Sequence, residues 1–261
     1  MNRDPLPNRL ARLDAGSARV RLGGMARPDG VVIVSERFWA FANRDGSLRE
    51  GTVPAAPDRV SRVPLVRGLI RLAASLTPLF RGTGVARRGE RWLLGAAVLA
   101  PCAFVFLPER ASLAAGIALT VGLVLWLLRG RTLALHGAEH RAIAAAEEGR
   151  LHATWAGEAR PSRFSPRCGT NFAVLVFPVA IAADRLWPVP PAFYTPAVVA
   201  VLSLALSMEL WRAVQAARGF GRVFLLPGLA LQRVTTREPA LGETRLALAA
   251  AASVLERELA D

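Results

Sequence analysis

The sequence predicts a mainly α-helical membrane protein with four transmembrane helices arranged as two hairpins. Two observations lead to this prediction, namely long apolar runs in a strongly basic chain and an uneven distribution of charge around those runs. The chain has 261 residues, of which 52% are hydrophobic, and a formal net charge of +13. It is too apolar for a disordered protein. With only two cysteines, it also does not suit a disulfide-stapled secreted fold.

The apolar residues gather in four runs. These are residues 92–107, 111–128, 172–187 and 192–211. A spanning helix needs about 20 apolar residues, with a lower limit of about 17. The second and fourth runs meet this requirement, and the first and third are close enough to serve as their partners in two hairpins. The alternative is a soluble bundle with buried helices.

The arginines indicate an orientation. All 33 basic residues are arginines, and the two loops that would face outward contain only Arg110 and Arg185, so the other 31 lie on the inner side. This bias follows the positive-inside rule. We therefore expect both termini to be cytoplasmic and the bilayer partner to present anionic headgroups. The N-terminal residues lack the apolar core of a cleavable signal peptide.

Segments outside the apolar runs predict a cytoplasmic part. Residues 31–53 combine β-branched and aromatic residues with an Asp45-Gly46 pair, which predicts a small N-terminal β element. Residues 64–80 carry a leucine stripe interrupted by arginines, which predicts an interfacial amphipathic helix. The chain end predicts a C-terminal amphipathic helix. The expected order is a β-containing segment at 1–63, the interfacial helix at 64–80, a transmembrane hairpin at 92–128, a cytoplasmic segment at 129–171, a second hairpin at 172–211 and a C-terminal segment at 212–261.

The segment between the hairpins contains an H-x-x-E-H motif, formed by His136, Glu139 and His140. Residues four apart share a face of a helix, so the two imidazoles could bind one metal ion. Glu139 would then be the catalytic residue, acting on a bound water as in inverted zinc-protease motifs. The chain has only three histidines, which strengthens the pairing. We therefore expect a divalent metal cofactor, with zinc as the first choice.

A zinc site needs a third protein ligand. Glu147 shares the helical face but lies roughly 16 Å along the axis from His136, too far to complete the same site. Cys168 and Glu209 are the candidates, because both lie where apolar runs meet the cytoplasmic side. For Cys168 the alternative is a small buried residue at a helix start. For Glu209 the alternative is an ion pair with Arg212.

A second polar run follows the last apolar segment. Its candidate residues are Gln232, Arg233, Thr235, Thr236, Arg237 and Glu238. Hydroxyl and guanidinium donors suit phosphate or carboxylate groups, which favours a contact with an anionic ligand or lipid headgroup. The alternative is an internal polar network that holds the tail against the H-x-x-E-H helix, with a threonine capping the final helix.

Several sequence blocks resemble one family. LHGAEH at 135–140, PRCGTNF at 166–172 and LLPGLALQRVTTREP at 225–239 resemble blocks of the YqhQ-like family of bacterial membrane proteins, also called domain of unknown function 1385. PLVRGLI at 64–70 and GGMARPDG at 23–30 are similar to two further blocks. The resemblance implies a metal-dependent enzyme in the bacterial cytoplasmic membrane. The residues that occupy its blocks are His136, Glu139, His140, Glu147, Cys168 and the run at 232–239.

Two function classes remain open from the sequence. The first is a membrane enzyme, such as a hydrolase, with a metal site at the cytoplasmic face of the membrane. The alternative is a non-catalytic scaffold or accessory subunit whose polar cluster is structural. A transporter is disfavoured because the first two apolar runs offer no polar path. Nucleic acid is not an expected partner, since the arginines are spread over every segment outside the runs. The sequence leaves a membrane-protein partner or a homo-oligomer open.

Overall fold

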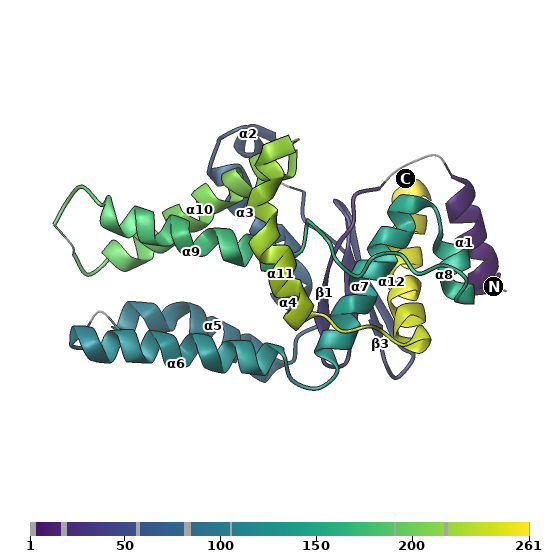
Figure 1. Cartoon of the computed structure of the whole chain (residues 1–261), viewed down its shortest axis with the longest axis horizontal. Helices are drawn as coiled ribbons and strands as arrows, with labels where there is room; N and C mark the ends of the chain where they lie inside the picture. Colours follow the sequence, from purple (N-terminus) through teal and green to yellow (C-terminus); the bar gives the residue numbers. More distant parts are fainter. Residues whose placement is uncertain are drawn as a thin grey trace. The chain divides into compact units, whose positions relative to one another are not determined.

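The computed structural model of the chain describes residues 4–16, 20–55, 58–80, 85–104, 106–190, 192–216 and 219–260 (Figure 1). The chain forms two compact units, each built from separate stretches of sequence. Unit 1 consists of Met1–Ala55, Leu128–Cys168 and Leu229–Asp261, and unit 2 consists of Ala56–Leu127 and Gly169–Gly228. Each unit is therefore assembled only when distant parts of the chain come together.

Unit 1 contains a four-stranded antiparallel sheet in the order β1-β2-β3-β4. Its strands are β1 (Gly23–Arg27), β2 (Gly30–Val34), β3 (Phe38–Asn43) and β4 (Leu48–Thr52). The turn between β3 and β4 contains the Asp45-Gly46 pair, and Gly46 has a φ of 86°, a conformation that favours glycine. The expected β element is present, and it starts earlier and has more strands than a single hairpin.

Aromatic rings on β3 cover glycines of the neighbouring strands. A side chain at Gly51 would meet the indole of Trp39 within 2.5 Å, and one at Gly30 would meet the ring of Phe41 within 3.0 Å. Trp39 and Phe41 are both 2% exposed. The rings therefore fill space that the glycines leave empty, and this contact favours one register between β3 and its two neighbouring strands.

Four helices complete unit 1. They are α1 (Leu6–Ala15), α7 (Thr132–Glu148), α8 (Leu151–Ala156) and α12 (Leu241–Ala260). Helix α7 packs on β1 and β2, α12 packs on β2 and β3, and α1 and α8 pack on α12 (Figure 1). Leu248 and Val254 of α12 are completely buried in a core that also includes Val31 and Leu135. The C-terminal helix is therefore the centre of the core rather than a peripheral amphipathic helix.

The apolar runs form helices in unit 2. This unit contains α2 (Asp58–Ser61), α3 (Val66–Ser75), α4 (Thr77–Phe80), α5 (Arg88–Phe104), α6 (Glu109–Leu127), α9 (Gly169–Arg185), α10 (Thr195–Ala216) and the 3₁₀ helix η1 (Gly219–Leu225). Helix α11 (Leu226–Thr235) leads from unit 2 into unit 1. Helices α5 and α6 follow each other as one hairpin, and α9 and α10 as another.

The prediction of four transmembrane helices is wrong. In the described part of the chain, one helix, α10, is long and apolar enough to cross a membrane, whereas the apolar part of α6, Arg110–Trp126, is shorter. Helices α5 and α9 have 17 residues each, or about 25 Å at 1.5 Å per residue. A bilayer core is about 30 Å thick. Charged residues at the start of α5 and the end of α9 shorten their apolar parts further.

The expected interfacial helix is interrupted. Within residues 64–80, helix α3 begins at Val66, and α4 follows it after a break at Leu76. Helix α3 packs on α10, where a side chain at Gly68 would meet Met208 Cβ at 2.7 Å. Arg67 of α3 forms an ion pair with Glu209 of α10. This arginine therefore contacts a protein carboxylate.

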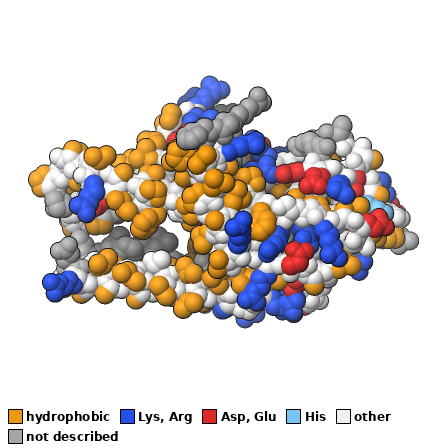
Figure 2. All heavy atoms as spheres, viewed as in Figure 1, with side chains coloured by type: hydrophobic (Ala, Val, Ile, Leu, Met, Phe, Trp, Pro, Cys, Tyr) orange, Lys and Arg blue, Asp and Glu red, His pale blue; other side chains and the backbone are white. Residues whose placement is uncertain are grey.

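Unit 2 exposes large apolar side chains. Trp92, Leu99, Leu125 and Phe177 are between 66% and 71% exposed. Figure 2 shows hydrophobic side chains over the visible face of these helices, whereas charged side chains gather over unit 1. Such continuous apolar surface is unusual for a protein that is surrounded by water on all sides.

One close backbone approach organises unit 1. The segment after α11 crosses α7 at Gly137, where an added Cβ would lie 2.2 Å from the carbonyl oxygen of Arg237 and 3.2 Å from Pro239 Cδ. The N–H of Arg237 also donates to the carbonyl of Leu133 at 2.9 Å. Only glycine fits at position 137 without moving this segment.

We predict that Gly137→Ala destabilises the protein although alanine favours helices. The added methyl group would collide with a backbone oxygen, so the free energy of unfolding should fall by about 1–3 kcal/mol. Gly242→Ala is the matched control, since Gly242 lies in α12 with no atom within 4 Å of an added Cβ. It should be neutral or stabilising by up to about 1 kcal/mol. Thermal unfolding followed by circular dichroism measures both, and equal melting temperatures for the two variants would contradict the prediction.

Candidate metal centre

The two motif histidines lie on adjacent turns of α7. Because a helix has 3.6 residues per turn, side chains four apart point in nearly the same direction. The ring centroids of His136 and His140 are 4.5 Å apart, with an angle of 64° between the rings. The helix ends at Gly149, whose φ of 64° is the left-handed conformation that glycine adopts at helix ends.

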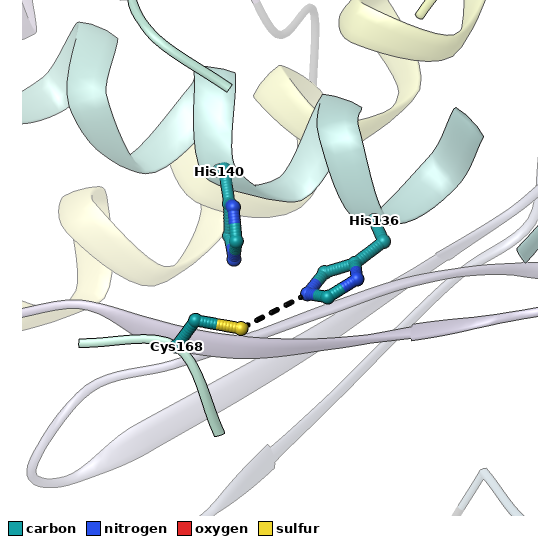
Figure 3. Close-up of side chains that lie close together, drawn as sticks. All are labelled: His136, His140 and Cys168. Carbon is teal, nitrogen blue, oxygen red and sulfur yellow. Dashed lines mark hydrogen bonds between the residues drawn. The ribbon is translucent and has the colours of Figure 1, made fainter. Parts of the chain in front are cut away.

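Cys168 joins the two histidines from a distant part of unit 1. It ends the segment that follows α8 and is 7% exposed. Its Sγ lies 3.2 Å from Nε2 of His136 (Figure 3). The potential ligand atoms of His136, His140 and Cys168 all lie within 4.8 Å of one another. These three residues could therefore hold a metal ion.

Backbone carbonyls orient both rings. Nδ1 of His136 lies 2.9 Å from the carbonyl oxygen of Thr235, and Nδ1 of His140 lies 2.7 Å from that of Arg163. A carbonyl accepts hydrogen bonds but cannot donate them, so each neutral ring must have its proton on Nδ1. Each Nε2 then has a lone pair available. This is how metal-binding histidines are usually fixed by their surroundings.

Burial keeps the imidazoles neutral. It lowers the pKa of His140 to about 4, with a smaller contribution from the nearby His136 and an opposing one from the Arg163 carbonyl. Burial also lowers the pKa of His136. Both rings are thus uncharged near pH 7, which is the form that binds metals.

The donor set fits a divalent metal ion. Nε2 of His140 is buried, and no described residue satisfies it with a hydrogen bond. An unsatisfied buried nitrogen is costly, and a metal ion would remove that cost. Two imidazole nitrogens and a thiol sulfur are typical zinc ligands. A soft sulfur ligand also disfavours magnesium and calcium.

The segment that carries Cys168 is held by a buried glutamine. Gln232 is fully buried, and its Nε2 donates to the carbonyl of Ser165 at 2.8 Å. In return the Ser165 N–H donates to Gln232 Oε1 at 2.9 Å. The side-chain amide therefore pairs with both backbone groups of one residue, as a neighbouring strand would. This pairing fixes the chain close to Cys168.

An ion pair holds the next part of that segment. Arg167, directly before Cys168, pairs with Glu147 near the end of α7. Glu147 is not one of the grouped ligands, in agreement with its distance along the helix. Its contact with Arg167 instead anchors the cysteine segment to the helix that carries the histidines.

Glu139 faces strand β1. It is 5% exposed, and its burial raises its pKa to about 8, although a hydrogen bond from the backbone of Ala26 opposes this shift. A side chain at Gly24 would meet the Glu139 Cγ at 2.8 Å, so glycine makes room for the carboxyl group. No described residue forms a hydrogen bond with Glu139 Oε2. Glu139 is not among the grouped ligands.

Glu209 has a different set of partners. It belongs to unit 2, and its Oε1 accepts hydrogen bonds from Nε of Arg67 at 2.7 Å and from the N–H of Leu65 at 3.3 Å. Leu65 has a φ of 68°, which is strained for a residue with a side chain. Glu209 therefore caps the start of α3 and forms an ion pair with Arg67, and the charge of Arg212 also acts on it.

The residues after α11 contribute backbone carbonyls. The carbonyl of Thr235 holds His136, that of Thr236 accepts a bond from Arg163 at 2.9 Å, and that of Arg237 lies against Gly137. Both threonine hydroxyls donate to carbonyls one turn earlier, at 3.3 and 2.7 Å. The helix that follows begins later and is not capped by them.

Charged side chains of the same run differ in their surroundings. Glu238 Oε1 accepts a bond from Arg141 at 2.7 Å, and its Oε2 lies 3.7 Å from Arg163. The side chains of Arg233 and Arg237 are exposed. For Gln232, Thr235, Thr236 and Glu238, this placement favours the internal polar network over a direct contact with lipid headgroups.

Sequence patterns did not indicate three features of the centre. The carbonyls of Thr235 and Arg163 carry no residue-specific signal, because every residue has one. The partner of Gln232 is backbone, so the sequence could place the glutamine but not its role. The close approach at Gly137 was also not predicted, although a glycine inside a predicted helix is a sequence sign of close packing.

Comparison with known proteins agrees with the resemblance noted above. A family model described as "Protein of unknown function (DUF1385)" matches residues 116–257, which is more than half of the chain and includes both histidines, the cysteine and the run after α11. No curated protein and no solved structure matches the chain. The chain therefore belongs to the DUF1385 family, whose function is unknown.

Proposed function

We propose that the protein binds a divalent metal ion, with zinc as the first choice, through His136, His140 and Cys168. One observation carries the proposal: the carbonyls at Nδ1 leave the lone pair of each histidine on Nε2, and both Nε2 atoms lie within 4.8 Å of a buried thiol. Neutral imidazoles and a thiol that loses its proton on binding leave one negative charge to offset the two positive charges of the ion.

We further propose that the protein is a metal-dependent hydrolase. Structural zinc sites in proteins have four protein ligands, whereas catalytic sites have three and an open position. The three grouped residues match the catalytic number. A divalent ion at such a site supplies Lewis acidity and lowers the pKa of water.

Glu139 is the proposed general base of this hydrolase. A general base works best when its pKa lies near the pH of the reaction, and the pKa of Glu139 is about 8. Its Oε2, which has no described hydrogen-bond partner, is the atom that would accept a proton from water. Strand β1 packs against Glu139, and this burial raises its pKa.

The alternative function is a structural polar cluster in a scaffold or accessory subunit. The direct contact between Cys168 Sγ and His136 Nε2 at 3.2 Å supports it, because this contact satisfies two of the three ligand atoms without an ion. The Gln232 and Glu147 contacts would then serve rigidity alone. The two functions differ in whether metal copurifies with the protein.

We predict that the purified protein contains about one metal ion per chain, and that the double variant His136→Ala/His140→Ala loses it. Two of three ligands are then missing, so the remaining thiol cannot retain the ion. Elemental analysis for zinc, iron and manganese measures the content.

His152→Ala is the matched control, because this exposed histidine is in α8 and outside the ligand group. It should keep the wild-type metal content. Wild-type protein with far less than one ion per chain, and no difference in the double variant, would contradict metal binding and favour the scaffold. Cobalt substitution adds a test of the sulfur ligand, since a thiolate-to-cobalt charge-transfer band should disappear in Cys168→Ser.

We predict that Glu139→Gln removes a pH dependence of stability. The pKa of Glu139 is about 8 in the folded protein and 4.5 for an ordinary glutamate. The folded state therefore binds the Glu139 proton more tightly than the unfolded state does. The stabilisation that this gives is complete below pH 4.5 and is lost as the pH rises through 8. Between pH 5 and pH 7 the metal-free wild type should lose about 2 kcal/mol from this group.

Glutamine is neutral at both pH values, so the variant should not show this loss. Glu148→Gln replaces an exposed carboxylate of the same helix and should retain the wild-type dependence. Chemical unfolding of metal-free protein at pH 5 and pH 7 measures all three. Parallel curves for wild type and Glu139→Gln would show that the carboxyl is not buried as described.

We also propose that the protein is held in the bacterial cytoplasmic membrane by the apolar helices of unit 2, through which the chain enters and leaves the membrane on the same side, so that unit 1 and both termini are cytoplasmic. Helix α10 supports this by its length and apolarity. The exposed apolar side chains of α5, α6 and α9 add to it. The arginine-rich segments outside the apolar helices would then face anionic lipid headgroups.

We predict that the protein stays in the membrane fraction after an alkaline carbonate wash, and that Val201→Asp in α10 lowers this fraction. An aspartate in the middle of a spanning helix costs about 2.5–3.5 kcal/mol. Leu259→Asp is the matched control, since Leu259 is an apolar residue of α12 with 44% exposure, compared with 53% for Val201. It should partition as the wild type does. Release of the wild type by the wash would exclude an integral anchor.

A further inference from the structure

Unit 1 contains a cavity that lies apart from the histidine and cysteine group. Its volume is about 370 Å³, and it lies between the segment that follows α8, the start of α12 and one face of α7. The polar residues that line it are Arg141, Thr154, Arg160, Glu238 and Thr244. Pockets of this size accept small molecules. None of the three grouped metal-ligand candidates lines it.

Arg141 forms the inner wall of the cavity. Its side chain is 8% exposed, its Nε donates to the carbonyl of Pro161 at 3.1 Å, and its Nη2 donates to Glu238 at 2.7 Å. A guanidinium has five N–H groups, so these bonds leave donors for another partner. A buried arginine held in one orientation is suited to binding an anion with two parallel hydrogen bonds.

Glu238 is a weak partner for this arginine. Its side chain is 58% exposed, so water competes for its carboxylate. Solvent screens the exposed carboxylate of this pair, whereas the buried guanidinium requires an anionic partner. An anion that enters the cavity can therefore take the place of the carboxylate on Arg141. The carboxylate of Glu238 therefore occupies the position that the anionic group of a ligand would take.

Arg160 supplies a second positive charge at the mouth. It is exposed and lines the cavity, and within the described part of the chain it forms no hydrogen bond or ion pair. The start of α12, at Ala240 and Leu241, lines the same cavity and adds the partial positive charge of a helix N-terminus. The lining therefore has two arginines and one displaceable carboxylate.

We propose that this cavity binds the phosphate group of a small ligand, with Arg141 bonded to it in place of Glu238 and Arg160 closing over it. Arginine pairs suit phosphate because each planar fork matches two of its oxygens. The group could belong to a soluble phosphate monoester or to a lipid headgroup with a terminal phosphate. The site acts independently of the proposed metal centre, since it shares no ligand residue with it.

The test is a titration of the full-length protein in detergent with inorganic phosphate and with glycerol 3-phosphate, followed by calorimetry at constant ionic strength. Wild type should show saturable binding. Arg160→Ala should weaken it about tenfold, which is the loss expected for a hydrogen bond to a charged group. Glu238→Gln removes the competing carboxylate and should strengthen binding severalfold. These opposite changes are specific to the proposed arrangement.

Two controls separate this site from general attraction to a basic protein. Arg150→Ala removes an exposed arginine that does not line the cavity, and it should leave binding unchanged. The His136→Ala/His140→Ala variant should also bind phosphate normally, so failure of the metal proposal would not affect this result. Unchanged binding in Arg160→Ala and Glu238→Gln, or an equal loss in Arg150→Ala, would overturn the proposal.

Vesicles distinguish the source of the phosphate. If the ligand is a lipid, vesicles containing phosphatidic acid should compete with inorganic phosphate, whereas phosphatidylcholine vesicles should not. If it is soluble, glycerol 3-phosphate should bind at least as tightly as inorganic phosphate, and vesicles should not compete. Absence of saturable binding of every phosphate probe would refute the site itself.

Discussion

The close approach of the 236–239 backbone to α7 is the constraint on which the rest of unit 1 depends. It requires glycine at position 137, where an added Cβ would lie 2.2 Å from the Arg237 carbonyl oxygen. On one side of this crossing the carbonyl of Thr235 reaches His136, and on the other side Glu238 reaches Arg141. One backbone contact thus positions groups in both the candidate metal centre and the cavity.

Buried polar groups around α7 are organised by backbone partners. His136 and His140 are held by carbonyls, and Gln232 pairs with the backbone of Ser165. Backbone atoms packed in a core move little, so these partners hold the side chains with less loss of entropy than flexible partners would. Nε2 of His140 and Oε2 of Glu139, both on α7, are among the buried side-chain atoms that form no hydrogen bond in the described residues. Unpaired buried groups are expected at functional sites, where a ligand completes them.

Local patterns predicted much of the fold, and long-range contacts limited the rest. The H-x-x-E-H spacing predicted from helix geometry that two histidines share one face, and the position of Cys168 beside an apolar run suggested it as their partner. The four apolar runs predicted helices. Among the residues that the structure describes, α10 alone is long and apolar enough to cross a membrane. The burial of α12 could not be predicted from its own sequence. Many of its residues are alanines, and alanine is common both on the surface of helices and in cores, so the pattern does not show which face is buried. Contacts of backbone carbonyls, such as that of Thr235, have no sequence signature at all.

Consecutive residues of α7 face the two proposed sites. Each residue turns a helix by about 100°, so His140 and Arg141 point in different directions from one rigid element. Arg163 contacts both sides, since its carbonyl orients His140 and its guanidinium lies 3.7 Å from Glu238. The carbonyl belongs to the packed backbone and the guanidinium to the side chain, so an anion that displaces Glu238 from Arg141 changes the surroundings of the guanidinium and leaves the hydrogen bond to His140 in place. The two proposed sites therefore share a helix and a neighbouring residue but no ligand group, and each can be occupied without the other.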